Sequence, residues 1–150
     1  MRFISFYLFL LFPLIAVSNP VAVNPADAVL GQYWGEDNRY IIEMYKEGGQ
    51  YKGRFVWHIE DEKKDENNPN PDLQNRPLVG LTFLTDFQYY ERGNRWTDGK
   101  AYAADDGSTY SGKIWLEDPN TLKMRGYIGI SLFGRTATFI RIAAGKDIPK

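Results

Sequence analysis

The chain contains no cysteine and a single histidine, His58, among its 150 residues. The absence of cysteine excludes a disulfide framework and a lipoprotein anchor, so stability has to come from a packed core. One imidazole cannot form a histidine-based metal site, and no metal or cofactor is predicted. The chain also lacks an excess of either sign of charge, because 18 basic and 19 acidic residues leave a net charge of -1. This balance gives no long-range attraction to nucleic acid or to an anionic membrane surface.

Long apolar runs are absent except at the N-terminus. Arg2 precedes a mostly apolar run over residues 3–17, and residues 16–18 are small residues typical of a cleavage site. We therefore expect a secretory signal peptide at residues 1–18, a mature chain that begins at Asn19 or a nearby residue, and a periplasmic or secreted protein. The run is shorter than the roughly 20 residues that span a bilayer, so no transmembrane span is predicted in the mature chain. A retained N-terminal anchor is the alternative.

Short segments with alternating hydrophobicity, separated by turn residues, make up the rest of the chain. Two prolines make residues 19–30 an extended lead-in, in which residues 27–30 are compatible with one helical turn, and residues 143–150 form a tail. The expected strands cover residues 31–35, 39–46, 51–59, 77–84 and 86–90 (a pair, or one bent strand), 96–102, 109–116, 121–128 and 136–142. Strands at intervals of roughly 8 to 12 residues, with no long helical pattern, are typical of an all-β sandwich or barrel. We predict one domain over residues 31–142, an up-and-down antiparallel β-barrel of about eight strands.

Three of the expected strands carry a glycine in the middle of an apolar face, namely Gly53, Gly112 and Gly126. Because glycine weakens a flat strand, its repetition on one face favours strands that coil around a closed barrel. The same alternation directs six side chains into the interior as candidate ligand contacts: Phe55, Trp57, Tyr110, Ile114, Leu122 and Met124. Two alternatives remain open for this interior. It holds a ligand cavity, which the glycines enlarge, or side chains fill it completely.

Polar segments offer little sign of catalysis. Residues 60–76 are charged and rich in Asn and Pro, which is typical of a long exposed loop with a functional or mobile role. His58 shares a strand face with two basic residues, and this favours a solvated position. The acidic clusters at 60–66 and 105–106 do not follow the spacing of a calcium-binding loop and are interpreted as solvated.

No Gly-x-Ser-x-Gly motif surrounds a serine, and no catalytic residue is assigned. A hydrolase of envelope glycans or lipids remains an alternative. It would use His58 or Asp106, with Trp96 and Tyr90 exposed for stacking on sugars.

Several short motifs occur in the order and spacing of one bacterial family. They are Ile42-Glu43-Met44-Tyr45, Tyr51-Lys52-Gly53 followed by Trp57, Asp65-Glu66-Asn67-Asn68-Pro69, Arg76-Pro77-Leu78-Val79-Gly80-Leu81, Trp96 with Gly99-Lys100, Asp106-Gly107 with Tyr110, and Arg125-Gly126-Tyr127 up to Arg141. Over residues 31–142 the chain resembles the bacterial "domain of unknown function 2147" proteins, small secreted chains grouped with the lipocalin-like, or calycin, barrels. The resemblance implies a lipocalin-like fold.

The resemblance also implies how one end of the barrel closes. The opening motif of the family is similar to the lipocalin Gly-x-Trp motif, in which the Trp seals one end beneath an Arg from the last strand. Here Gly31 opens the motif, Tyr33 occupies the position of that Trp, and Trp34 follows one residue later. The last strand ends in Phe139-Ile140-Arg141. Arg141 is therefore expected to stack on Tyr33 or Trp34.

Together these features predict a secreted or periplasmic barrel that binds a small apolar or amphipathic molecule without turnover. Tyr110, with Glu43 or Arg125, is expected to orient the polar end of the ligand. The alternative from another class is an envelope protein-interaction module with a solid core, whose loop at 60–76 contacts a protein partner. No nucleic-acid partner is predicted.

Overall fold

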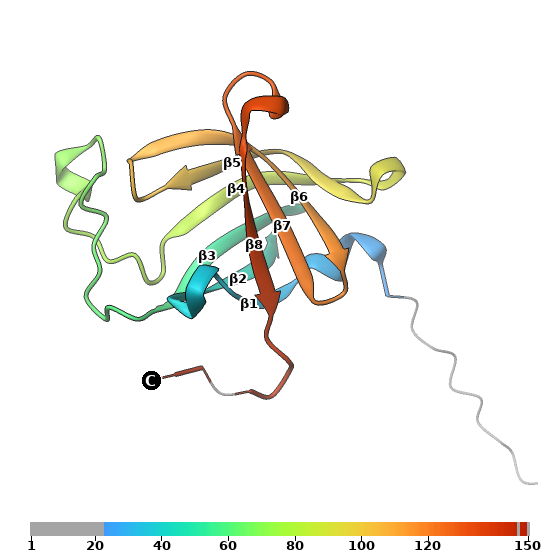
Figure 1. The fold of residues 1–150 in the computed structure, drawn as a ribbon, viewed down its shortest axis with the longest axis horizontal. Helices are drawn as coiled ribbons and strands as arrows, with labels where there is room; N and C mark the ends of the chain where they lie inside the picture. Colours follow the sequence, from blue (N-terminus) through green and yellow to red (C-terminus); the bar gives the residue numbers. More distant parts are fainter. Residues whose placement is uncertain (1–22, 147, 150) are drawn as a thin grey trace, which may run out of the picture.

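The structure, a computed structural model, describes residues 23–146 and 148–149, and its strands form a closed antiparallel barrel (Figure 1). The strands are β1 (Gly31–Trp34), β2 (Tyr40–Glu47), β3 (Gln50–His58), β4 (Thr82–Tyr90), β5 (Arg95–Ala103), β6 (Ser108–Asp118), β7 (Thr121–Tyr127) and β8 (Arg135–Arg141). Each strand pairs with the next along the chain, and β8 pairs with β1. The predicted up-and-down barrel of eight strands is confirmed. The expected signal peptide lies outside the described residues.

The connections between strands gather at two ends of the barrel. The mouth end consists of residues 35–39, 59–81, 104–107 and 128–134. The closed end consists of the turns β2–β3, β4–β5 and β6–β7 together with the 3-10 helix η1 (Pro25–Val29). In Figure 1 the long loop before β4 (green) and η1 (blue) lie on opposite sides of the barrel.

The helix η1 is formed by local sequence signals, and it closes its end of the barrel by packing on the core. Asn24 caps the helix, since its side chain accepts a hydrogen bond from the backbone N–H of Ala26, and Pro25 stands at the first helical position. Ala26 and Val29 are buried and belong to the hydrophobic core. The lead-in predicted to be extended therefore contains a short helix that plugs the barrel.

Side chains fill the closed half of the barrel. The most deeply buried of them include Trp96, Tyr33, Phe87, Met44, Leu84, Ile114 and Leu122. Trp96 is 1% exposed, and its Nε1 donates a hydrogen bond to the carbonyl of Ala26 at 3.1 Å. The prediction that Trp96 is exposed for stacking on sugars is therefore wrong, because β5 pairs it with the inward-facing Ile114.

Two of the three predicted glycines make room for neighbouring side chains. A Cβ atom on Gly112 would lie 2.7 Å from Cζ of Phe87, whose ring also covers Gly99. A Cβ atom on Gly53 would lie 2.7 Å from Cδ1 of Leu84. The volume that these glycines leave free is therefore occupied by Phe87 and Leu84, and it is not available to a ligand.

Several strand boundaries differ from those predicted. Residues 77–81 belong to the loop before β4, and β4 is one bent strand with Asp86 at φ 65°. Ile59 and Ile128, which end two of the predicted strands, lie beyond the ends of β3 and β7 and are 56% and 75% exposed. Among the described residues no helix has the length and apolar character needed to cross a membrane.

Candidate functional site

The last strand meets the first through an arginine stacked on an aromatic ring. Arg141 pairs with Tyr33 across β8 and β1, and its guanidinium carbon lies 4.6 Å from the centre of the Tyr33 ring. The same side chain donates hydrogen bonds to three carbonyls, those of Ala28 at 2.6 Å, Leu30 at 2.7 Å and Pro119 at 2.8 Å. Arg141 thus joins η1, the β6–β7 turn and β1 at the closed end.

Of the two aromatic residues that the sequence offered, Tyr33 and Trp34, it is Tyr33 that lies beneath the guanidinium of Arg141. Its hydroxyl donates to the carbonyl of Val29 at 2.8 Å, and burial raises its pKa to about 12 although the charge of Arg141 opposes this shift. Gly31 allows the arginine to approach, since its φ is +130° and a Cβ atom there would lie 2.9 Å from Nη1 of Arg141. These contacts hold together one end of the barrel and leave no room there for a ligand.

A β-bulge reverses the predicted alternation near the end of β3. Ile42 pairs with Phe55, whereas the adjacent Ile41 pairs with Trp57, so Val56 is an extra residue on β3. Beyond the bulge each side chain of β3 points to the face opposite to the one that simple alternation predicts.

The bulge places Trp57 on the outer face of the barrel, and its predicted position in the interior is wrong. Its ring packs edge to face on Trp34, with the ring centres 5.6 Å apart, and both lie outside the core cluster. Trp57 Nε1 is buried and has no hydrogen-bond partner among the described residues.

The same bulge turns His58 inward, where only 9% of it is exposed, instead of into solvent as predicted. Its ring stacks on Tyr40, and its Nδ1 lies 3.0 Å from the backbone nitrogen of Glu60.

The inward-facing positions of β6, β7 and β8 are most deeply buried near the middle of the barrel and are more exposed at the mouth end, and Leu116 at the closed end of β6 is partly exposed as well. Nearer the closed end, Ile114, Leu122 and Phe139 are at most 1% exposed. Toward the mouth, the inward positions of the same strands are only partly buried, and they are held by Tyr110, Met124, Gly126 and Ala137. Solvent therefore reaches this part of the interior, which we call the mouth wall (Tyr110, Met124, Gly126, Ala137).

Three aromatic side chains from β2, β3 and β4 line the interior next to the mouth wall. Phe55 stacks on Phe83 with the ring centres 4.2 Å apart, and Tyr40 packs edge to face on Phe55 at 5.6 Å. Tyr40 also contacts Phe139, which belongs to β8. Burial, with the nearby carboxylate of Glu36, raises the pKa of Tyr40 to about 12. Tyr40 and Phe55 are partly exposed, and the contact of Tyr40 with Phe139 places this aromatic surface beside β8 of the mouth wall.

Polar groups stand at the rim of the mouth wall. The hydroxyl of Tyr110 donates to Oδ2 of Asp106 at 2.6 Å, and this bond, with the Ser108 backbone N–H and the charge of Arg135, lowers the pKa of Asp106. Arg135 is exposed, pairs with Gly126 on β7, and takes part in none of the ion pairs found among the described residues. The rim thus combines a cation, a phenol and the carboxylate of Asp106 beside an apolar wall.

The other two polar candidates lie on the outer face of the barrel. Glu43 forms an ion pair with Arg54. Arg125 donates hydrogen bonds to Thr136 and to the loop between β7 and β8. Neither side chain reaches the mouth wall, so the expectation that they orient a ligand is not met. Within the described ranges, no group of three or more His, Asp or Glu side chains is arranged to hold a metal ion.

The long loop, residues 59–81, is fixed to the barrel by a buried carboxylate. Asp65 is 0% exposed, and its carboxylate accepts hydrogen bonds from Tyr102 at 2.6 Å, Asn68 at 2.7 Å and Arg76 at 2.8 Å. Burial by itself raises the pKa of Asp65, but these hydrogen bonds outweigh it and bring the pKa below the usual value of 3.8. The loop therefore rests on an ionised Asp65 and extends from the mouth end as a fixed structure.

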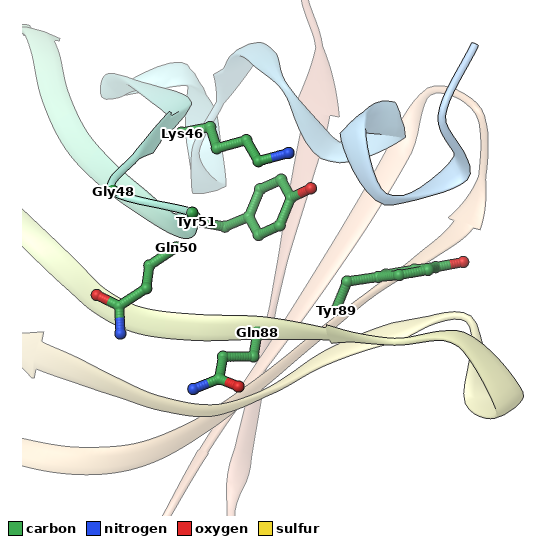
Figure 2. Close-up of a pocket in the computed structure, with 7 residues that line it drawn as sticks. Lys46, Gly48, Gln50, Tyr51, Gln88 and Tyr89 are labelled. Atoms are coloured by element: carbon green, nitrogen blue, oxygen red, sulfur yellow. The ribbon is translucent and has the colours of Figure 1, made fainter. Parts of the chain in front are cut away.

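A second concave region lies outside the barrel, beside the β2–β3 turn. It has a volume of about 450 Å³ and is lined by Lys46, Gly48, Gly49, Gln50, Tyr51, Gln88 and Tyr89. Figure 2 shows Lys46 and Tyr51 side by side, with Gln88 and Tyr89 contributed by β4. Asp27 already accepts hydrogen bonds from Lys46 at 2.9 Å and Tyr51 at 2.6 Å. Because its charged groups are paired and it is mostly polar, this hollow is a weaker candidate than the mouth wall.

Of the six predicted ligand contacts, the structure brings Tyr110 and Met124 to the mouth wall and Phe55 next to it. Ile114 and Leu122 lie in the filled closed half, and Trp57 lies outside. Sequence patterns did not point to Tyr40, Ala137 and Arg135 as parts of the site. The alternation of β2 puts Tyr40 on the same face as Ile42 and Met44, so its inward position could have been predicted. The rim position of Arg135 could not, because it depends on where β8 begins.

An eight-stranded antiparallel barrel, closed at one end by a short helix and an arginine–aromatic stack and more exposed at the other, is a lipocalin-like barrel. The chain belongs to the family described as "Uncharacterized protein conserved in bacteria (DUF2147)", whose match covers residues 31–141.

Among solved structures, the chain is similar to protein HP1028 from the human pathogen Helicobacter pylori, which is described as belonging to the lipocalin family. The two are 27% identical with a TM-score of 0.67, and the similarity covers 77% of this chain and 84% of HP1028. The comparison with curated proteins gave no match.

Proposed function

We propose that this protein binds a small amphipathic molecule at the mouth wall, without chemical turnover. The observation that carries the proposal is the partial exposure of the inward-facing Met124 and Ala137 at the mouth end, next to Leu122 and Phe139, which are at most 1% exposed. Apolar side chains that remain accessible inside a rigid barrel favour the burial of an apolar group. The filled closed half limits the ligand to the mouth end.

The apolar part of the ligand contacts Met124, Ala137 and the aromatic surface of Tyr40 and Phe55. Arg135 stands at the rim and suits an acidic or polar head group, because a guanidinium binds carboxylate and phosphate groups through several hydrogen bonds. The Tyr110 hydroxyl already donates to Asp106, so the head group pairs with Arg135. The ligand class is therefore an amphipathic acid. The lipocalin description of HP1028 supports a binding role of this kind.

Calorimetric titration with decanoate and with decanol tests this proposal. The protein is expected to bind both, and decanoate more tightly, because only the acid pairs with Arg135. Phe55→Ala should weaken both ligands about tenfold through lost apolar contact. Arg135→Gln should remove only the preference for the acid.

Matched controls come from the closed end of the barrel. Tyr90→Ala and Arg92→Gln remove an exposed aromatic and an exposed cation there, and both should bind like the unchanged protein. Phe55→Leu keeps an apolar side chain in case Phe55→Ala unfolds. Absence of binding in the unchanged protein, or equal affinities across all variants, contradicts the proposal.

A further inference from the structure

The loop between β7 and β8, residues 128–134, presents four large apolar side chains to solvent at the mouth end. The exposed fractions are 75% for Ile128, 60% for Ile130, 74% for Leu132 and 79% for Phe133. Figure 1 shows this apolar loop projecting beyond the strands as a narrow tip. Exposed apolar residues scattered singly are normal, but four in one seven-residue loop mark a surface that contacts something apolar.

The backbone of the apolar loop is hydrogen-bonded from below. Arg125 donates from Nε to the carbonyl of Ser131 at 2.6 Å and from Nη2 to the carbonyl of Leu132 at 3.0 Å. The carbonyl of Ile130 accepts from the backbone N–H of Phe133 at 3.3 Å. Polar backbone groups entering a bilayer need internal partners, since the hydrocarbon supplies none. The carbonyls of Ile130, Ser131 and Leu132 already have such hydrogen-bond partners.

Cationic side chains adjoin the base of the apolar loop. Lys113 lies 3.2 Å from the hydroxyl of Ser131, Arg125 holds the loop carbonyls, and Arg135 follows the loop directly. Asp106, beside Arg135, offsets part of this charge. An apolar tip with cations behind it matches the order of layers in a phospholipid surface, where acyl chains lie beneath anionic phosphates.

We propose that the apolar loop inserts into a phospholipid bilayer, with Lys113, Arg125 and Arg135 at the level of the phosphates. A narrow protruding tip fits a fluid bilayer, whereas a protein partner or a second copy would need a hollow of matching shape. The inference is independent of ligand binding at the mouth wall, although insertion would bring that wall close to the membrane surface.

Flotation with vesicles of phosphatidylglycerol and phosphatidylethanolamine tests the insertion. The unchanged protein should float with the vesicles. The double variant Leu132→Ser with Phe133→Ser should bind at least about tenfold more weakly, because two apolar side chains no longer leave water. Val23→Ser removes a 78% exposed apolar side chain at the opposite end of the barrel and should float normally. All variants share one N-terminus, so a retained leader does not account for a difference between them.

A fluorescent label reports directly on the tip, because the chain has no cysteine of its own. Phe133→Cys and, as control, Val23→Cys are each labelled with a polarity-sensitive dye. The emission of the label at position 133 should shift to the blue when vesicles are added, and that at position 23 should not.

Three outcomes overturn the proposal. They are equal flotation of the double variant, an unshifted label at position 133, and self-association in sedimentation experiments that the double variant abolishes without any vesicle binding. If vesicles of phosphatidylcholine alone bind as tightly as those that contain anionic phosphatidylglycerol, the role assigned to Lys113, Arg125 and Arg135 is contradicted.

Discussion

At the scale of single residues, arginines organise this barrel through backbone carbonyls and aromatic faces. Arg141 binds three carbonyls and covers Tyr33, and Arg125 binds two carbonyls of the apolar loop. A guanidinium carries five donors in a fixed plane, so one side chain can join segments that are far apart in sequence. A lysine in the same place has a point charge and a different geometry.

Arg141→Lys should lower the free energy of unfolding by about 1–3 kcal/mol, because several carbonyls at the closed end lose their donors. Chemical denaturation measures this change. Arg92→Lys, an exposed arginine in the β4–β5 turn, is the control and should be neutral. A fully stable Arg141→Lys protein contradicts the assigned role.

Asp65→Asn should release the long loop. Asn keeps the size of the side chain but loses the charge that Arg76 pairs with, at a cost of about 1–3 kcal/mol for the unsatisfied partners. Faster amide hydrogen exchange in residues 59–81 is the measurement, and the exposed Asp61→Asn in the same loop is the control. Unchanged exchange in this loop argues against the network.

The same network predicts a pH dependence in the unmodified protein. The pKa of Asp65 is lower in the folded state than its usual value, so the ionised form stabilises the fold. Its contribution is complete above about pH 5 and is lost as the pH falls through the lowered folded value. The protection of the long loop against hydrogen exchange, measured relative to the intrinsic exchange rate at each pH, should therefore fall selectively in acid.

At the scale of elements, glycines and bulges decide what the strands place inside. The β3 bulge exchanges the inward and outward positions of Trp57 and His58. Gly112 faces the ring of Phe87, whereas a Cβ atom on Gly126 would meet only Cβ and Cγ of Tyr110, at 3.5 and 3.9 Å. The interior is therefore filled at the first glycine, whereas the second would accept a methyl group in ordinary contact with Tyr110.

Gly112→Ala should destabilise the barrel by about 1–3 kcal/mol, because the added methyl group overlaps the Phe87 ring. Gly126→Ala should leave the free energy of unfolding within about 1 kcal/mol, since the new contact is an ordinary one. Denaturant titrations of the two variants measure the contrast. Equal effects would show that the interior is not filled as described.

At the scale of the whole molecule, the two ends of the barrel differ in side-chain packing and in exposure to solvent. The closed end joins η1, β1 and β8 through Arg141, and its core leaves no space for a ligand. The mouth end carries the partly exposed wall, the fixed long loop and the apolar loop. The deeply packed side chains thus gather toward the closed end, and the accessible apolar side chains lie at the mouth end.

The location of the molecule in the cell remains a prediction from its N-terminus. Expression in a bacterial host followed by fractionation should place the protein in the periplasm or the medium, with an intact mass that corresponds to a chain starting at Asn19. A cytoplasmic protein of full mass contradicts this, and a membrane-bound protein that retains residues 1–18 supports the alternative of an anchor.

Local sequence determined the strands, the turns and the closed barrel, because alternation and turn residues act over a few neighbours. The family resemblance predicted that Arg141 stacks on an aromatic ring, and it left open only whether that ring belongs to Tyr33 or Trp34. Tertiary structure decided the rest. The extra residue in β3, the ring of Phe87 on Gly112 and the burial of Asp65 depend on strand register and on contacts between distant segments, which no local pattern encodes. The candidate site moved from a central cavity to the mouth wall for that reason.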